Sequence, residues 1–279
     1  MKNIKKISSG HNACAGCGQL SAVQSVMRAL DNNTIIANAT GCLEVTTTPY
    51  PQSAWGVPWI HSLFENPAAV ATGVLAALKN KKNNKTKVVV MAGDGGTFDI
   101  GMGVISGMWE RKENILYICY DTESYSNTGF QASGATPYGA STSTSPKGNK
   151  AKCEIKRTCE SIDEVGNKFQ KKDMIRIALA HDVPYVAQTT AAYPNDIFNK
   201  VKKALEIKGP AYIQILSPCI PGWGIKTDEA VEISRLASQS NLYPLLEYVN
   251  GELVSGGLNK EEDAIKYREE YKKKQKRFN

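Results

Sequence analysis

The sequence predicts an α/β protein with a doubly wound parallel sheet, and two observations carry this prediction. Short apolar runs of strand length, such as residues 88–92 and 115–120, alternate with helical patterns along the chain, as in parallel sheets that helices cover on both faces. Several of these runs end in glycine-rich or polar turns, for example at residues 93–96. Because ligands of open α/β sheets bind outside the carboxyl ends of the strands, these turns mark the expected ligand-binding edge.

Local signals define the elements that precede this turn. A helical pattern covers residues 21–30, and a short apolar run predicts a strand at 34–39. Residues 43–63 are rich in Pro and Trp and have no clear period, which predicts an ordered loop that serves as a lid or an interface. The next helix is expected over residues 67–79, because its Asn-Pro start offers an N-cap residue and a proline suited to the first helical position.

The elements after the glycine-rich turn follow the same alternation. A helix from about residue 98 to 110 joins the two central strands, and residues 138–171 form a long excursion rich in Gly, Ser, Thr and Lys. The remaining elements are expected at residues 173–181 (helix), 185–189 (strand), 194–207 (helix) and 211–216 (strand). The chain is therefore divided into residues 1–224 and a helical C-terminal extension, residues 225–279, that packs on another subunit or on the chain's own sheet.

The composition is that of a globular protein without a membrane span. Of the 279 residues, 42% are hydrophobic and 22% are charged, and no apolar run approaches the roughly 20 residues that a membrane helix needs. The start of the chain lacks the apolar segment of a secretory signal, so a cytoplasmic location is expected. In that reducing compartment, the seven cysteines serve metal binding or chemistry rather than disulfides.

The formal net charge of +7 is dispersed along the chain. The lysine-rich stretches at residues 79–87 and 260–279 are expected to be solvated faces, with a docking surface for an acidic partner as the alternative. These stretches lack interleaved aromatic residues, and no nucleic-acid-binding module is recognised. Nucleic acid is therefore not an expected partner.

A diphosphate and magnesium site is predicted at the ligand-binding edge. The glycines at residues 93–96 let the backbone approach a ligand, and the helix N-terminus that follows favours an anion. Asp94 would repel a bare phosphate, so its presence indicates a divalent cation between the two. The Asp121-Thr122 pair at the end of the next strand offers further oxygen ligands. Taken alone, the Gly-Asp-Gly turn is equally compatible with a tight connection between strand and helix.

Four cysteines fall in Gly- or Pro-flanked turns at or near the same edge, namely Cys14, Cys17, Cys42 and Cys219. Four thiolates suit either zinc or a [4Fe–4S] cluster. Structural zinc usually joins two close pairs, whereas here one close pair meets two distant single cysteines. Cys119 lies in the middle of a strand and is expected to be a buried core thiol.

The remaining candidates for chemistry give weaker signals. Cys153 and Cys159 lie at a spacing that fits no common metal pair, and their role stays open. The three histidines form no catalytic pattern with serine and aspartate and are expected to be structural. Glu65 and Glu123 are candidate acid–base groups, although a helix dipole explains Glu65 equally well.

Several motifs occur together over residues 11–224, namely CAGCG, ATGC, SLFEN, GDGGTFDIG, YDTESYSNTGFQ-x-S-x-ATP and SPC-x-PGW. Together they resemble the β subunit of pyruvate:ferredoxin oxidoreductase, in the 2-oxoacid:ferredoxin oxidoreductase family. The resemblance implies a catalytic domain that binds thiamine diphosphate, Mg²⁺ and one [4Fe–4S] cluster. The implied reaction is the oxidative decarboxylation of pyruvate with coenzyme A to acetyl-CoA and CO₂, with ferredoxin as the electron acceptor.

The resemblance also implies roles for individual residues. The cluster ligands are expected to be Cys14, Cys17, Cys42 and Cys219. The magnesium ligands are expected to be the side chains of Asp94 and Thr122 and the backbone carbonyl of Ser124. The residues expected around the cofactor are Gly93, Gly95 and Gly96 at the diphosphate, Gly41 and Phe64 at the rings, and Asn127 at the substrate's carbonyl region. Thr122 departs from the family, which usually has Asn there, but it still offers an oxygen ligand.

The resemblance further implies partner subunits. Thiamine enzymes need a carboxylate at the aminopyrimidine ring, and in this family that group comes from the α subunit with the pyrimidine-binding domain. The other expected partners are a γ chain, a ferredoxin-like δ chain or a fusion of these, and ferredoxin itself. The chain alone is therefore expected to bind cofactors weakly and to be inactive.

Three alternatives stay open at the level of the sequence. The first is the same chemistry on 2-oxoisovalerate, 2-oxoglutarate or oxalate, since the substrate pocket is shared with the partner. The second is a non-redox thiamine enzyme, and the third is a zinc-stabilised binding protein. Two one-electron transfers need a nearby one-electron acceptor, which zinc cannot be, and a binding protein leaves Asp94 and Thr122 without a role.

Overall fold

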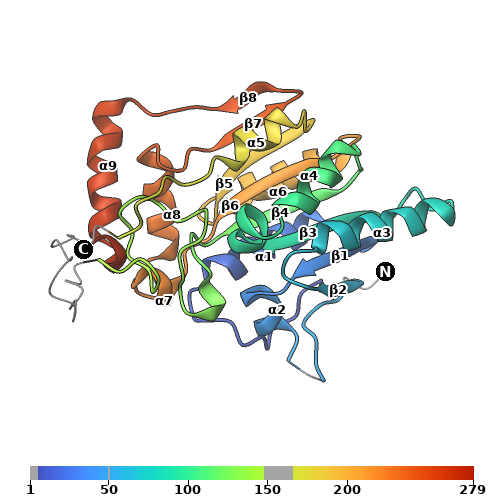
Figure 1. Cartoon of the computed structure of the whole chain (residues 1–279), viewed down its shortest axis with the longest axis horizontal. Helices are drawn as coiled ribbons and strands as arrows, with labels where there is room; N and C mark the ends of the chain where they lie inside the picture. The colour runs from blue at the N-terminus through green and yellow to red at the C-terminus, as the bar shows by residue number, and fades with distance from the viewer. Residues whose placement is uncertain (1–5, 50, 148–165) are drawn as a thin grey trace, which may run out of the picture.

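The computed structural model describes residues 6–49, 51–147 and 166–279, and its central feature is an eight-stranded sheet with the strand order β2-β1-β3-β4-β6-β5-β7-β8 (Figure 1). Strands β1 to β6 pair in parallel, whereas β7 pairs antiparallel with β5 and β8 pairs antiparallel with β7. The predicted doubly wound parallel sheet is therefore confirmed. Within these ranges, no helix has both the length and the apolar character needed to cross a membrane.

The strands are β1 (Thr34–Ala39), β2 (Trp59–Ser62), β3 (Lys87–Gly93), β4 (Leu116–Asp121), β5 (Tyr185–Thr190), β6 (Ala211–Leu216), β7 (Leu246–Val249) and β8 (Glu252–Gly256). The helices are α1 (Gly18–Ala29), α2 (Cys42–Thr47), α3 (Pro67–Asn80), α4 (Met102–Glu110), α5 (Met174–Ala180), α6 (Pro194–Glu206), α7 (Ile220–Trp223), α8 (Ala230–Gln239) and α9 (Glu261–Lys273). The short helical turns are η1 (Gly95–Asp99), η2 (Ser126–Thr128) and η3 (Lys276–Phe278).

Helices cover both faces of the sheet because alternate side chains of a strand point to opposite sides. On one face, α1 and α6 pack over a cluster that contains Val89 and Met91 of β3. On the other face, α3, α4 and α5 pack over a cluster that contains Val88 and Val90 of the same strand. This double burial explains why the central strands are apolar along their whole length.

Two stretches differ from the sequence prediction. The predicted loop 43–63 contains most of α2 and the edge strand β2, whose pairing with β1 joins Ile36 to Trp59 and Ala39 to Ser62. The predicted helical tail contains α8 and α9 but also the β7–β8 hairpin, which extends the sheet beyond β5. β2 and β8 are the two edge strands and carry exposed residues, and β7 between β5 and β8 has only four residues. None of the three therefore has the hydrophobic pattern that identifies central strands.

The start of α3 also departs in detail from its expected form. Asn66 occupies the N-cap position and Pro67 the first turn, as predicted. The Asn66 side chain makes no capping hydrogen bond, however, and its buried Oδ1 has no partner among the described residues.

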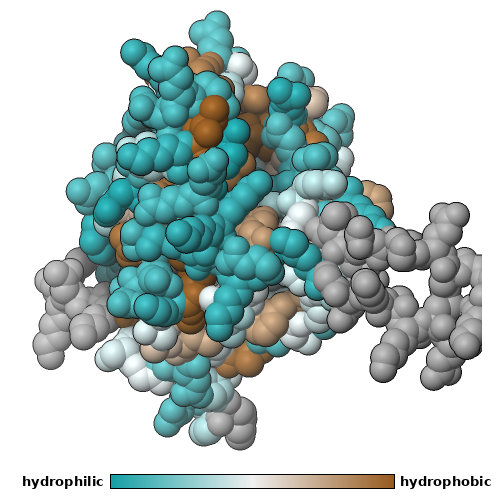
Figure 2. All heavy atoms as spheres, turned by 90° about the vertical axis from the view of Figure 1, so that its left-hand side faces the viewer, coloured by the Kyte–Doolittle hydropathy of each residue, from teal (hydrophilic) through white to brown (hydrophobic). Residues whose placement is uncertain are grey.

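Residues on both sides of position 224 share one hydrophobic cluster. Leu216 and Trp223 pack there with Ile233, Tyr243 and Tyr271 from the C-terminal extension. The extension therefore packs on the rest of the chain, and its contact with another subunit stays a prediction. Figure 2 looks onto the side where α9 lies, and this surface is mostly hydrophilic with small separate hydrophobic areas.

Trp109 tests the core on the face of α3 to α5. Its side chain is fully buried, and its ring centroid lies 5.2 Å from that of His181 and 5.6 Å from that of Tyr212. Trp109→Ala should lower the free energy of unfolding by about 3–5 kcal/mol, because a cavity replaces the ring. Leu258→Ala, at a side chain that is 71% exposed, should change it by less than about 0.5 kcal/mol. Urea denaturation measures both, and equal effects would contradict this packing.

Candidate functional site

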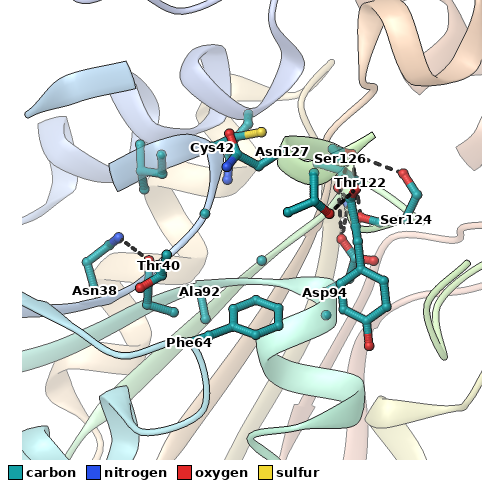
Figure 3. A pocket seen from close by; sticks show the side chains of 18 residues that line it. Asn38, Thr40, Cys42, Phe64, Ala92, Asp94, Thr122, Ser124, Ser126 and Asn127 are labelled. Carbon is teal, nitrogen blue, oxygen red and sulfur yellow. Dashed lines mark hydrogen bonds between the residues drawn. The ribbon is translucent and has the colours of Figure 1, made fainter. Parts of the chain in front are cut away.

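The ligand-binding edge carries a cavity of about 290 Å³ beyond the ends of β1, β3 and β4 (Figure 3). Nine of the residues predicted to contact the cofactor line it, namely Gly41, Cys42, Phe64, Gly93, Asp94, Gly95, Thr122, Ser124 and Asn127. The predicted Gly96 lies just outside this lining, where a Cβ atom would come 3.0 Å from the backbone oxygen of Phe64. The structure therefore gathers the predicted residues at one place, and we call this space the cofactor cavity.

Asp94 and Thr122 join the loops that follow β3 and β4. Thr122 donates hydrogen bonds from its backbone N and its Oγ1 to Asp94 Oδ1, at 3.1 and 2.8 Å. Thr122 Oγ1 also lies 3.1 Å from the backbone oxygen of Ser124. A carboxylate, a hydroxyl and a carbonyl oxygen thus meet at one corner of the cofactor cavity. This is the set of ligands that a hard cation such as Mg²⁺ prefers.

Asp94 is buried, and its carboxylate lies near the carboxylate of Asp121. Its side chain accepts a further hydrogen bond from Ser133 Oγ at 2.5 Å, and the residue is 1% exposed. Burial, and next the nearby Asp121 carboxylate, raise the pKa of Asp94 to about 7. A cation at this corner would favour the ionised carboxylate and lower that pKa. The residues present therefore fit a divalent cation.

Two glycines and an aromatic pair shape the neighbouring wall. A Cβ atom at Gly93 would meet no atom within 4 Å, so the backbone there is open to the cavity. A Cβ atom at Gly95 would lie 2.1 Å from the Tyr125 ring and 3.0 Å from the Phe64 ring. These two rings pack in a tilted arrangement with centroids 5.9 Å apart. Gly95 is therefore required by the aromatic wall, and Gly93 leaves space that a ligand can fill.

Behind the loop that follows β4 lies a group of four charged residues that we call the buried charge cluster: Asp121, Glu123, Lys171 and Arg277. Lys171 Nζ lies 2.5 Å from Asp121 and 2.8 Å from Glu123, and Arg277 lies 2.6 Å from the other carboxylate oxygen of Glu123. Burial alone would raise the pKa of Glu123, but the two cations hold it below its ordinary value. Glu123 does not line the cofactor cavity, so its suggested role as an acid–base group there is wrong.

Three residues of this region were not predicted from the sequence. Ser133 lies within the motif GFQ-x-S-x-ATP, which was the available signal for it. Lys171 lies at the end of the long Gly-, Ser-, Thr- and Lys-rich excursion, and Arg277 lies at the end of the C-terminal extension. Neither segment offers a local pattern that predicts these contacts. The pairing of Arg277 with Glu123, for example, joins residues 154 positions apart.

The four predicted cluster cysteines, Cys14, Cys17, Cys42 and Cys219, line a second cavity of about 50 Å³. Cys42 also lines the cofactor cavity, so the two spaces share a wall. In the described part of the chain, no three His, Cys, Asp or Glu side chains are grouped as ligands of one ion. Four thiols that line one cavity suit either zinc or a [4Fe–4S] cluster.

The state of these thiols argues against a nucleophilic role. Burial raises the pKa of Cys17 and of Cys219. Burial, with smaller contributions from the neighbouring cysteines, raises the pKa of Cys42 to about 12. A thiol is nucleophilic only as a thiolate, and metal binding removes its proton. Cys17, Cys42 and Cys219 therefore suit metal ligation rather than covalent catalysis.

Cys119, His61 and His181 have the structural roles expected of them. Cys119 is fully buried in β4. His61 and His181 each lie 2.8 Å from a hydroxyl of a neighbouring segment. Cys153 and Cys159 lie outside the described residues, so their role stays open.

A comparison with protein families identifies the class. The family described as "Thiamine pyrophosphate enzyme, C-terminal TPP binding domain" matches residues 39–215. This segment extends from the end of β1 almost to the end of β6 and includes the corner formed by Asp94 and Thr122. The chain therefore belongs to the thiamine pyrophosphate enzymes and carries their cofactor-binding domain.

Similar proteins narrow this class. The chain is 46% identical to the pyruvate synthase subunit PorB of Methanothermobacter thermautotrophicus, over 98% of this chain and 89% of the relative. It is 41% identical to the ketoisovalerate oxidoreductase subunit VorB of Pyrococcus abyssi, over 96% of this chain and 84% of the relative. The chain belongs to the family of pyruvate:ferredoxin oxidoreductase β subunits, as its motifs suggested, and is one subunit of a multi-subunit oxidoreductase.

A solved structure supports the same fold. The 2-oxoglutarate:ferredoxin oxidoreductase from Magnetococcus marinus superposes with a TM-score of 0.63 at 24% sequence identity. The superposition covers 84% of this chain and 81% of that chain. The sheet and its surrounding helices are therefore shared with this enzyme.

Gly95→Ala tests the aromatic wall of the cofactor cavity. The added methyl group would overlap the Tyr125 ring and cost about 1–3 kcal/mol in overpacking. Displacement of the ring to relieve this strain should weaken thiamine diphosphate binding by about tenfold or more. Gly103→Ala in α4 is the matched control, since its Cβ atom would meet no atom within 4 Å. It should leave binding unchanged and stabilise the protein by about 0.5–1 kcal/mol. Calorimetric titration of the cofactor-depleted complex measures both, and unchanged binding in Gly95→Ala would rule out the proposed wall.

Proposed function

We propose that this chain is the subunit of a pyruvate:ferredoxin oxidoreductase that holds both thiamine diphosphate and a [4Fe–4S] cluster. The enzyme would convert pyruvate and coenzyme A to acetyl-CoA and CO₂ and pass the electrons to ferredoxin. One observation carries this proposal: Cys42 lines both the cofactor cavity and the cavity of the four cysteines. A redox cofactor in the first space and a cluster in the second would therefore lie on either side of this one residue.

In the cofactor cavity, oxygen ligands are proposed to bind the cation, and mostly small residues are proposed to surround the cofactor. Asp94, Thr122 and the backbone carbonyl of Ser124 are proposed to hold Mg²⁺, because their oxygens already converge. The residues proposed to surround the cofactor and the substrate are Gly93, Gly95 and Gly96 at the diphosphate, Gly41 and Phe64 at the rings, and Asn127 at the substrate carbonyl.

When bound, thiamine diphosphate supplies the electron-accepting chemistry that decarboxylation of a 2-oxoacid requires. The chain's own residues would bind the cation, enclose the cofactor and orient the substrate. The buried Asp94 would hold the cation that offsets the diphosphate charge, and the Phe64–Tyr125 pair would form one wall around the cofactor. Asn127 lines the same cavity, and its amide is proposed to donate a hydrogen bond to the substrate's carbonyl oxygen. Substrate orientation would thus come from groups that stay fixed during the reaction.

In the second cavity, Cys14, Cys17, Cys42 and Cys219 are proposed to ligate the [4Fe–4S] cluster. Ferredoxin accepts one electron at a time, so an acceptor that changes charge by one electron is needed beside the cofactor. Zinc has no redox chemistry, whereas an iron–sulfur cluster does.

The partners are proposed from what the cofactor cavity lacks. Asp94 is the only carboxylate among the described residues that line it, and binding the cation occupies that group. The carboxylate that activates thiamine is therefore proposed to come from the pyrimidine-binding α subunit. The γ and ferredoxin-like δ chains, or a fusion of these, would complete the coenzyme A site and the route to ferredoxin.

Pyruvate is the proposed substrate, and 2-oxoisovalerate is the second candidate. PorB relatives from several organisms are 42–48% identical to this chain. The VorB relative follows at 41%. This small margin favours pyruvate and keeps the branched 2-oxoacid as the alternative.

The function is tested by ferredoxin reduction with the co-expressed complex. Pyruvate with coenzyme A should give the highest kcat/KM among the 2-oxoacids, and the isolated chain should turn over nothing. A preference for 2-oxoisovalerate would establish the second candidate instead. Full activity of the isolated chain would overturn the proposed partner carboxylate.

Iron content tests the proposed cluster ligands. Cys219→Ser should remove about four iron atoms per β subunit from the anaerobically purified complex, together with one reduced-cluster signal in electron paramagnetic resonance. Cys119→Ala, at the buried thiol of β4, should leave both unchanged. Full iron content in Cys219→Ser, or stoichiometric zinc in the wild type, would contradict the assignment.

A further inference from the structure

The side chains of the three residues after β4 point alternately to opposite sides of the loop, so they belong to two different sites. Thr122 and Ser124 line the cofactor cavity, and their oxygens are the proposed cation ligands. Glu123 between them does not line the cavity and is 4% exposed. Its carboxylate lies on the other side of the loop, in the buried charge cluster. The orientation of both oxygen ligands therefore depends on where Glu123 is held.

The backbone at Glu123 adopts an unfavourable conformation. Its φ angle is +58°, in the left-handed region that a residue with a side chain rarely enters. Its N–H donates to Asp121 Oδ1 at 3.1 Å, and its carbonyl oxygen accepts from Thr136 Oγ1 at 2.8 Å. Such a conformation persists only where the surroundings fix it, so the contacts of the Glu123 side chain matter for the loop.

Arg277 contacts this loop by two routes. Its Nη2 donates to Glu123 Oε2 at 2.6 Å. Its guanidinium carbon also lies 3.7 Å above the centroid of the Trp223 ring, and Trp223 Nε1 donates to the backbone oxygen of Thr122 at 2.9 Å. One side chain thus holds the residues on both sides of the Thr122–Glu123 peptide bond.

Arg277 is itself fixed in place. It is 5% exposed, although it belongs to the otherwise charged and solvated end of the chain. Its Nε donates to Gln275 Oε1 at 2.7 Å, and its Nη2 lies 3.1 Å from the Tyr271 hydroxyl. A planar guanidinium makes these bonds and the stack on Trp223 together, which the single ammonium of lysine does not.

We infer that Arg277 is a positioning residue for the cation site: it holds the loop of Thr122, Glu123 and Ser124 so that two oxygens face Asp94. Lys171 assists from the other oxygen of Glu123. The C-terminal extension would thereby complete the cofactor site of the domain before it, without touching the cofactor. The inference rests on the proposed function, in that Thr122 and Ser124 are taken as cation ligands.

The test measures thiamine diphosphate binding to the cofactor-depleted complex by calorimetry, over a series of Mg²⁺ concentrations. Arg277→Met should weaken thiamine diphosphate binding by about 10- to 100-fold, as loss of a group that orients a metal ligand usually does, and should raise the Mg²⁺ concentration for half-saturation. Arg277→Lys should recover part of this loss. Iron content should stay at the wild-type value, because the side-chain hydrogen bonds of Arg277 go to Glu123, Tyr271 and Gln275 and not to a cluster cysteine.

Two further variants separate positioning from folding. Glu123→Gln combined with Arg277→Met leaves no unpaired carboxylate, so it should unfold near the wild-type temperature and still bind the cofactor weakly. Lys274→Met is the control from the same segment, since it removes an ion pair with Glu232 in which the two side chains are 27% and 48% exposed. It should leave the Kd within about twofold, as expected for a surface pair.

Each outcome decides the inference. A folded Arg277 variant with the wild-type Kd and Mg²⁺ dependence would overturn it, and so would failure of every Arg277 variant to assemble, which would make Arg277 a folding residue. The Thr122→Val variant distinguishes an error in the role of Arg277 from an error in the proposed function. If Thr122→Val keeps the wild-type Mg²⁺ dependence, the cation site itself is wrong. If Thr122→Val weakens binding and the Arg277 variants do not, the error lies in the role of Arg277 alone.

Discussion

The hydrogen bonds from Thr122 to Asp94 are the link around which the site is arranged. They form because the parallel register pairs Gly93 of β3 with Tyr120 of β4, which brings the ends of the two strands to the same level. A carboxylate buried as deeply as Asp94 is costly unless it is hydrogen-bonded, and Thr122 and Ser133 provide those bonds. The oxygen corner, the cofactor cavity and the proposed magnesium site all depend on this link.

The approach of the cysteines depends on a second close contact at the same edge. Cys17 directly precedes Gly18, whose N–H donates to the backbone oxygen of Pro218 at 3.2 Å. A Cβ atom at Gly18 would lie 2.7 Å from the Pro218 ring, so only glycine permits this approach. The contact brings the CxxC turn against the turn that carries Cys219, and Cys42 joins them from the end of β1. Three separate segments therefore form one set of thiols.

The C-terminal extension is more closely connected to the site than its position in the chain suggests. It adds the β7–β8 hairpin to the sheet and shares a hydrophobic cluster with Trp223. It also supplies one of the two cations that pair with Glu123. Buried ion pairs persist where both partners and their remaining hydrogen bonds are satisfied, and the buried charge cluster meets that condition. The loop with the proposed cation ligands is thus supported from behind by residues far away in sequence.

The sequence by itself determined the central strands, the helices that cover them, nine residues that line the cofactor cavity and the four cysteines of the second cavity. Apolar runs buried on both faces carry a strong local pattern, and the motifs around Asp94 and Thr122 lie at strand ends whose common edge follows from parallel topology. Only the tertiary structure decided the edge strand β2, the β7–β8 hairpin, the burial of Glu123 and the pairing of Lys171 and Arg277 with it. Those features come from contacts between distant segments, and no local periodicity or propensity encodes such contacts.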